Sequence, residues 1–105
     1  MASGKILEKE IVKAVLDYLH YRGIMAWRNN TGAFMSDNNG RRGFYKFGEN
    51  GSGDIFAVKD KFYAIECKRP GGIQSESQKI WQQRLTQAGG VYILCYSVDD
   101  ISKIL

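Results

Sequence analysis

Residue types that build extracellular scaffolds and many metal sites are scarce in this sequence. It has two cysteines and one histidine among 105 residues. Small secreted domains usually carry a framework of paired cysteines, and zinc-finger and HNH-type sites need more sulfur or nitrogen ligands than this chain offers. Because Cys67 and Cys95 lie inside apolar runs without C-x-x-C spacing, we expect buried, unpaired thiols in a reducing compartment. We interpret His20, near the end of a predicted helix, as structural.

Long apolar runs are also missing. No segment approaches the roughly 18 consecutive apolar residues of a membrane span, and the opening MASGKILEKE lacks the apolar centre of a secretion signal. We therefore expect a cytoplasmic protein. The chain has no repeat, linker or low-complexity tract, and its length suits one domain over residues 1–105. The net charge of +4 is compatible with a polyanionic partner without requiring one.

The apolar pattern predicts an α/β chain in the order helix, three strands, helix, strand, helix. Residues 5–22 have helical spacing, with Ser3 as a candidate N-cap and Gly23 as a stop. A second helix over 75–90 begins at an S-x-x-Q capping box and ends at Gly-Gly. The remaining predicted elements are a strand at 24–29, a hairpin over 54–68 with its tip at 59–61, a strand at 91–96 and a short helix at 98–105. We interpret residues 31–53 as a long functional loop.

The predicted hairpin brings three charged side chains together. If Val58 pairs with Phe62, then Asp54 lies opposite Glu66, and strand alternation puts Lys68 on the same face as Glu66. Two neighbouring carboxylates repel each other unless a proton or a cation lies between them, and hard ions such as Mg²⁺ prefer carboxylate oxygens. A nearby lysine can hold or deprotonate a water, or neutralise charge on a phosphate. The pattern favours a metal-dependent hydrolytic site.

The same three residues are also typical of an ordinary solvent-exposed surface without a function. Glutamate and lysine two residues apart on an edge strand are common in water, and Asp54 after Gly-Ser-Gly is typical of a turn. The order of the elements favours the functional interpretation. A helix, a Gly-Asp at the start of one strand, E-x-K at the end of the next and a following helix resemble the PD-(D/E)xK nuclease superfamily.

Within that superfamily, the chain resembles a stand-alone virus-type replication-repair nuclease (VRR-NUC) domain. The matching segments are LEKEIVKAVLDYL, GSGDIFAV, YAIECKRP and SQKIWQQRLTQAGGVYIL. Gly53 stands where the superfamily pattern has proline. The resemblance implies a restriction-endonuclease-like core, a mixed central sheet flanked by helices, and a bacterial or phage-infected cell as the setting.

The resemblance also implies roles for individual residues. Asp54 and Glu66 would bind Mg²⁺ or Mn²⁺ together with the backbone carbonyl of Cys67, and Lys68 would be the catalytic lysine. Glu10, which we place at the edge of the first helix's apolar stripe, would be an outer-shell group or a further ligand. Asp17, at a similar angle, we interpret as a solvated rim residue.

Gln78 has two interpretations that do not exclude each other. The S-x-x-Q pattern makes it a helix cap, and the resemblance makes it an active-site glutamine that orients water or phosphate.

The predicted long loop carries cations among aromatic residues, a combination suited to branched or single-stranded DNA. A solvated loop with a small satellite core is the alternative. We expect DNA contacts from Arg28, Arg41, Arg42, Lys46 and Arg69.

Together these features predict a Mg²⁺- or Mn²⁺-dependent DNA endonuclease that acts on branched DNA. Members of the resembled family pair into homodimers, and a two-fold dimer supplies the two cuts that resolve a four-way (Holliday) junction. The alternatives are a catalytically idle nucleic-acid-binding module of the same fold, a restriction or flap-type nuclease of the same superfamily, and a monomer whose aromatic residues fill its own core.

Overall fold

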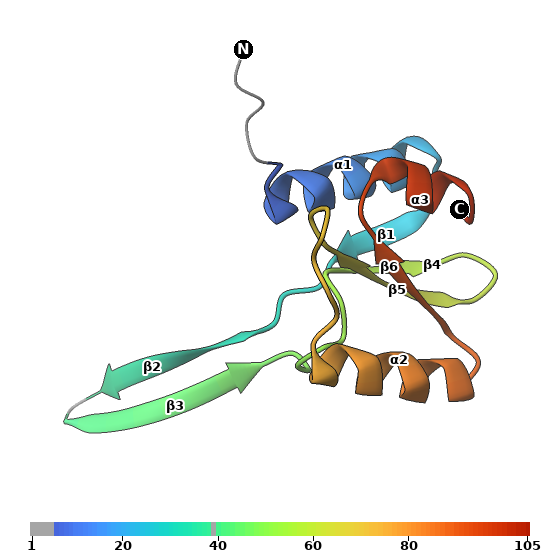
Figure 1. Ribbon diagram of the computed structural model, residues 1–105. Helices are drawn as coiled ribbons and strands as arrows, with labels where there is room; N and C mark the ends of the chain where they lie inside the picture. Colours follow the sequence, from blue (N-terminus) through green and yellow to red (C-terminus); the bar gives the residue numbers. More distant parts are fainter. Residues whose placement is uncertain (1–5, 39) are drawn as a thin grey trace, which may run out of the picture.

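A computed structural model describes residues 6–38 and 40–105 of the chain. Figure 1 shows a body of helices packed on a sheet, and a two-stranded arm that projects from it. The elements in chain order are α1 (Glu8–Tyr21), β1 (Met25–Arg28), β2 (Gly32–Asn38), β3 (Arg41–Phe47), β4 (Ile55–Val58), β5 (Phe62–Cys67), α2 (Glu76–Gln87), β6 (Val91–Cys95) and α3 (Val98–Ser102).

The body is built on a mixed sheet with the strand order β1-β4-β5-β6. β4 is antiparallel to both β1 and β5, whereas β6 runs parallel to β5 after the crossover through α2. α1 and α3 cover one face of this sheet, and α2 lies on the other (Figure 1). The expected α/β fold with a mixed sheet flanked by helices is therefore confirmed.

The main core lies between the sheet and the α1–α3 layer. α1 contributes a stripe of buried residues three or four positions apart, Ile11, Val12, Val15 and Leu19. The sheet contributes the alternate residues of β4, β5 and β6, so that every second side chain faces α1. Cys67 and Cys95 belong to this core as free thiols with their sulfur atoms 3.6 Å apart, which confirms their predicted burial.

The ends of α1 match the prediction at one terminus only. Gly23 has a φ of +74° and closes the helix: its N–H donates to the His20 carbonyl, and the Ile24 N–H donates to the Leu19 carbonyl. The helix begins after Leu7, which makes no side-chain cap. Ser3, the expected N-cap, lies outside the described residues. The His20 ring nitrogen Nε2 donates to the Ala26 carbonyl at 2.8 Å, a structural contact between helix and strand.

Residues 31–53 are not the irregular loop that we expected. β2 and β3 pair along their whole length as an antiparallel ribbon, from Gly32 opposite Phe47 to Asn38 opposite Arg41. Gly40, in the tight connection, has a φ of +77°, which is a left-handed conformation that glycine adopts without steric cost. The predicted element order is therefore wrong here, because it lacks these two strands. We call residues 32–47 the arm.

Candidate functional site

The two candidate metal-binding carboxylates meet where β4 begins and β5 ends. The observed register pairs Val58 with Phe62 and Ile55 with Ile65, as the sequence predicted. The Asp54 N–H continues the ladder by donating to the Ile65 carbonyl at 2.7 Å, and Asp54 thereby lies opposite Glu66. The arm leaves the body at the same end of the sheet, because it connects the end of β1 to the start of β4 (Figure 1).

A polar network holds the backbone that leads into Asp54. The Asn29 amide nitrogen donates to Ser52 Oγ at 2.8 Å and to the Gly53 carbonyl at 2.9 Å. Gly53 has a φ of +113°, and a Cβ at this position would lie 3.1 Å from the Ile65 carbonyl oxygen. Proline is restricted to a φ near −65°, so neither proline nor a residue with a larger side chain fits this turn without strain. Sequence reasoning missed Asn29 and Ser52, which carry no motif of their own.

Asp54 is fixed by the strand opposite it. Its Oδ2 accepts a hydrogen bond of 2.8 Å from the backbone N–H of Cys67. Burial raises the pKa of Asp54, while the Cys67 hydrogen bond and the positive charge of Arg28 oppose that rise. Arg28 is thus close enough to the site to act on it electrostatically, from the last position of β1.

Glu66 is a buried carboxyl group, with only 6% of its surface exposed. Its Oε1 accepts a hydrogen bond of 2.7 Å from the Gln78 side-chain amide. Burial is the main cause that raises its pKa to about 7, and the charge of Asp54 adds to the effect. At neutral pH this carboxyl group is therefore divided between its protonated and ionised forms, so a cation between the two carboxylates would favour ionisation.

Gln78 caps α2 and also contacts the site, while its part in orienting water or phosphate stays a prediction. Its Oε1 accepts from the Ser75 N–H at 2.8 Å, and its own N–H donates to Ser75 Oγ at 3.2 Å, which completes the capping box of α2. Its side-chain amide nitrogen is left free to donate to Glu66. The start of α2 therefore fixes the orientation of the Glu66 carboxylate.

Lys68 lies beside Glu66 on the same face of the hairpin. Its Nζ is 3.9 Å from Glu66 Oε1, and its side chain is 15% exposed. Gly72 packs along its stem, because a Cβ at Gly72 would come within 3.2 Å of Lys68 Cβ. Lys68 is therefore a partly buried cation next to the carboxylate pair, with a route to solvent.

The acidic residue of α1 that influences this site is Glu8. Its negative charge raises the pKa of both Asp54 and Glu66. Glu8 is spaced four residues before Val12 and seven before Val15, so it continues the buried stripe of α1 toward the site. A count outward from that stripe would have identified it in the sequence.

Glu10 projects from a different part of α1. It is exposed and lines a hollow of about 220 Å³ with Ala14 and with Tyr96 and Val98 from the far side. A direct part for Glu10 in the site stays a prediction. Asp17 is exposed and bonded to Lys13 Nζ at 2.7 Å, which agrees with its interpretation as a rim residue.

The oxygen atoms at the site suit a hard divalent cation. Each carboxylate has one oxygen engaged, Asp54 Oδ2 by the Cys67 N–H and Glu66 Oε1 by Gln78, and a second oxygen without a protein hydrogen bond from the described residues. No group of three His, Cys, Asp or Glu side chains that could hold a metal occurs within residues 6–38 and 40–105. Mg²⁺ commonly takes one or two carboxylates and keeps several waters, so two carboxylates and the Cys67 carbonyl fit it.

The predicted DNA-contacting cations are spread over three places. Arg28 ends β1, the exposed Arg69 follows Lys68, and the exposed Arg42 and Lys46 lie on the arm. The side chain of Arg41 lies outside the described part of the structure. The structure thus brings Arg28 to the carboxylates and places the arm's cations farther along β3 (Figure 1).

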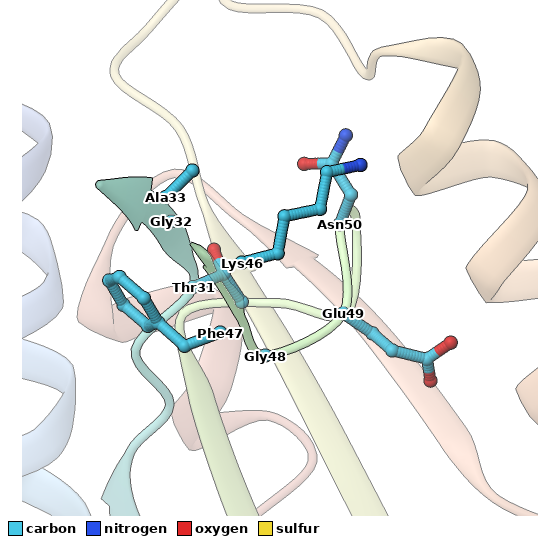
Figure 2. A pocket seen from close by; sticks show the side chains of 8 residues that line it. All are labelled: Thr31, Gly32, Ala33, Lys46, Phe47, Gly48, Glu49 and Asn50. Atoms are coloured by element: carbon cyan, nitrogen blue, oxygen red, sulfur yellow. The ribbon is translucent and has the colours of Figure 1, made fainter. Parts of the chain in front are cut away.

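A hollow of about 520 Å³ lies where the arm joins the body. Figure 2 shows the Lys46 and Asn50 side chains extending to the same side of it, while the Glu49 carboxylate points away from them. Phe47 forms part of its wall. A cation, an amide and an aromatic ring around one hollow provide groups for contacting a phosphate and a base.

Neither the protein-family models nor the curated proteins with which the chain was compared match it. Among the described residues, no helix is both long and apolar enough to cross a membrane.

Proposed function

We propose that this protein is a divalent-metal-dependent DNA endonuclease of the VRR-NUC type, within the PD-(D/E)xK superfamily. One observation carries the proposal: Asp54 lies opposite Glu66 on the β4–β5 hairpin, with Lys68 Nζ 3.9 Å from Glu66 and the Cys67 N–H bonded to Asp54. A buried and a half-buried carboxylate with raised pKa values and an adjacent lysine are costly to stability, and such arrangements concentrate at functional sites.

Asp54, Glu66 and the backbone carbonyl of Cys67 would hold the ion, Mg²⁺ or Mn²⁺. When bound, the ion supplies Lewis-acid stabilisation of the phosphoryl oxygens and lowers the pKa of water. Gln78 keeps the Glu66 carboxylate in one orientation through its 2.7 Å hydrogen bond. The hydrogen bond from Cys67 does the same for Asp54.

Lys68 would supply the positive charge that a phosphodiester needs during hydrolysis. Its ammonium group can donate to a non-bridging phosphate oxygen, where negative charge increases as water attacks, or hold the attacking water in line with the leaving group. The stem of Lys68 is packed against Gly72, and only a small part of the side chain is exposed. The donor is therefore directed rather than free in solvent.

DNA is the substrate that best fits the charges around this end of the sheet. Arg28 is close enough to Asp54 to lower its pKa, Arg69 directly follows Lys68 in the chain, and Arg42 and Lys46 extend positive charge along the arm. Arg41 begins β3 and adds to the charge of that strand. We propose four-way or otherwise branched DNA as the preferred structure and a homodimer as the active form, because one site per chain makes one cut.

The proposal is tested by incubating the purified protein with four-way, flapped, single-stranded and linear DNAs, in Mg²⁺, in Mn²⁺ and in EDTA. We expect cleavage only with a divalent ion, and loss of cleavage in Asp54→Asn, whose amide oxygen can still accept from Cys67. Asp17→Asn is the matched control, because Asp17 is an exposed carboxylate that pairs with Lys13 on the surface of α1. DNA binding without cleavage by the unmodified protein would favour an idle binding module, and cleavage that survives EDTA would contradict the metal site.

A further inference from the structure

The arm exposes large apolar side chains that none of the described residues covers. Within the described residues it consists of only two strands, and Figure 1 shows it extending away from the body. Isolated two-stranded ribbons are marginally stable in water, and contiguous exposed apolar patches mark interaction surfaces. The exposed apolar residues of the arm, with 44–63% of their surface in solvent, are Phe34, Met35, Phe44, Tyr45 and Phe47.

One face of the arm is a continuous row of aromatic rings, which we call the aromatic face: Phe34, Tyr45 and Phe47. The Phe34 and Tyr45 rings stack across the strands with centroids 5.2 Å apart, and Phe34 and Phe47 are 6.4 Å apart. Glycines make room for this row. A Cβ at Gly32 would lie 2.7 Å from the Phe47 ring, and one at Gly43 would lie 2.6 Å from the Tyr45 ring.

The opposite face of the arm has a different character. On this face the cross-strand pair Met35–Phe44 lies at the centre. The pair that contains Lys46 lies on one side of it, and the pair Asp37–Arg42 lies on the other. Because side chains alternate along a strand, Lys46 and Arg42 point away from the aromatic face. This charged face carries Lys46 and Arg42 and suits water and DNA phosphates, whereas the three half-exposed rings of the aromatic face gain from an apolar partner.

The body offers an apolar surface that could receive the aromatic face. α2 covers the β5–β6 side of its sheet face and reaches Phe56 through the Trp81 ring, 6.1 Å away. No helix of the described residues covers the β1–β4 side of the same face. Its residues Met25, Trp27 and Val58, which we call the bare strip, are 66%, 41% and 38% exposed.

We propose that the aromatic face of the arm docks on the bare strip of a second copy of this chain, in a two-fold exchange of arms. Each copy has one arm and one strip, so a single two-fold axis satisfies both contacts and closes the assembly at two chains. The arm extends away from its own body, with strands of about 20 Å, which is enough to span part of a partner. The charged face then remains free for DNA.

The exposed area is sufficient for a specific dimer. Three half-exposed rings and the three residues of the bare strip present about 600 Å² per copy, on the usual sizes of such side chains. Complete burial of these side chains in two copies would remove about 1,200 Å² from water, the lower limit of standard protein–protein interfaces. This inference deepens the homodimer of the proposed function and names its contact surfaces.

The test is the mass of the protein in solution without DNA, by sedimentation over a concentration series. We expect a dimer for the unmodified chain and a monomer for the double variant Phe34→Thr, Tyr45→Thr, since threonine keeps a high strand propensity. The matched control is Met35→Thr, Phe44→Thr on the charged face, which should stay dimeric. Val58→Glu in the bare strip should also give a monomer, with the arm intact.

A monomeric unmodified chain, or a dimer that survives both the aromatic-face and the strip variants, overturns the inference. A monomer whose aromatic-face variant loses single-stranded DNA binding overturns it in favour of base stacking on the rings. Mass is measured independently of cleavage. A monomer that cleaves DNA would therefore contradict the dimer and leave the nuclease assignment standing, whereas a dimer that cleaves no DNA would support the contact surfaces and contradict the nuclease assignment. Disulfide trapping between one population carrying Phe34→Cys and another carrying Val58→Cys should link the two chains only if the contact is the one described.

Discussion

Glu66 carries a carboxyl group that the fold buries beside a second carboxyl group. Its pKa rises from 4.5 to about 7, so the folded chain binds more protons than the unfolded chain between these values. Without a metal, the free energy of unfolding should therefore fall as the pH rises from about 5 to 8, by up to about 3 kcal/mol for this group. The rise in the pKa of Asp54 acts in the same direction.

Urea unfolding in EDTA at the two ends of that pH range measures this effect. Glu66→Gln removes the titrating group and should flatten the pH dependence, because a neutral amide has no proton to lose. An equally steep dependence in Glu66→Gln would show that another group is responsible.

Lys68 should separate catalysis from metal binding. Lys68→Ala removes the ammonium 3.9 Å from Glu66 but leaves both carboxylates in place. We expect the cleavage rate at saturating Mg²⁺ to fall by about 100- to 1,000-fold, with little change in metal affinity. Lys79→Ala is the control and should cleave normally, because Lys79 is exposed on α2 and pairs with the exposed Glu76. A large loss of metal affinity in Lys68→Ala would instead give Lys68 a structural part in the ion site.

Glu8 and Glu10 lie two positions apart on α1, and their side chains therefore project from different sides of the helix. Because the Glu8 charge raises the pKa of Asp54 and Glu66, Glu8→Gln should lower both pKa values and move the pH dependence of stability toward lower pH. Glu10→Gln is the matched variant. We expect a smaller shift from it, since Glu10 lines the hollow near Tyr96. The reverse order of effects would return the role to Glu10, as the family resemblance suggests.

At the scale of elements, the first turn of α2 combines a helix cap with a contact to the site. Ser75→Ala removes one capping hydrogen bond and should lower the free energy of unfolding by about 1 kcal/mol, with cleavage unchanged. Gln78→Ala should destabilise by a similar amount and also reduce the cleavage rate by about 10- to 100-fold, because Glu66 loses its orienting donor. Equal rates in the two variants would restrict Gln78 to capping.

The two strands of the arm have a signal in the sequence that our prediction overlooked. The dipeptide Asn39-Gly40 is a strong signal for a two-residue hairpin, and the aromatic residues on either side of it favour strands. The many glycine, asparagine and serine residues of 31–53 obscured this pattern. Gly32 and Gly43 are strand residues of β2 and β3, and glycine is needed there because a Cβ would collide with the Phe47 and Tyr45 rings.

Over the whole molecule, the body was predictable because each of its elements has a periodic apolar pattern and a capping or turn signal. The β4–β5 register follows from the three tip residues, which is why the sequence alone predicts Asp54 opposite Glu66. The position of Glu8 near the site depends on how α1 packs across the sheet, which local patterns do not specify. The same holds for the polar network of Asn29 and Ser52, whose members are 23 residues apart.

The central claim is that Asp54 and Glu66 form one divalent-cation site. Calorimetric titration of Mn²⁺ into the unmodified protein, Asp54→Asn and Asp17→Asn tests it most directly. We predict saturable binding by the unmodified protein and by Asp17→Asn, and its loss in Asp54→Asn, whose melting temperature in EDTA should be no lower than that of the unmodified protein because a repulsive charge is removed. Equal Mn²⁺ affinity in Asp54→Asn and the unmodified protein, or no binding by either, would contradict the account.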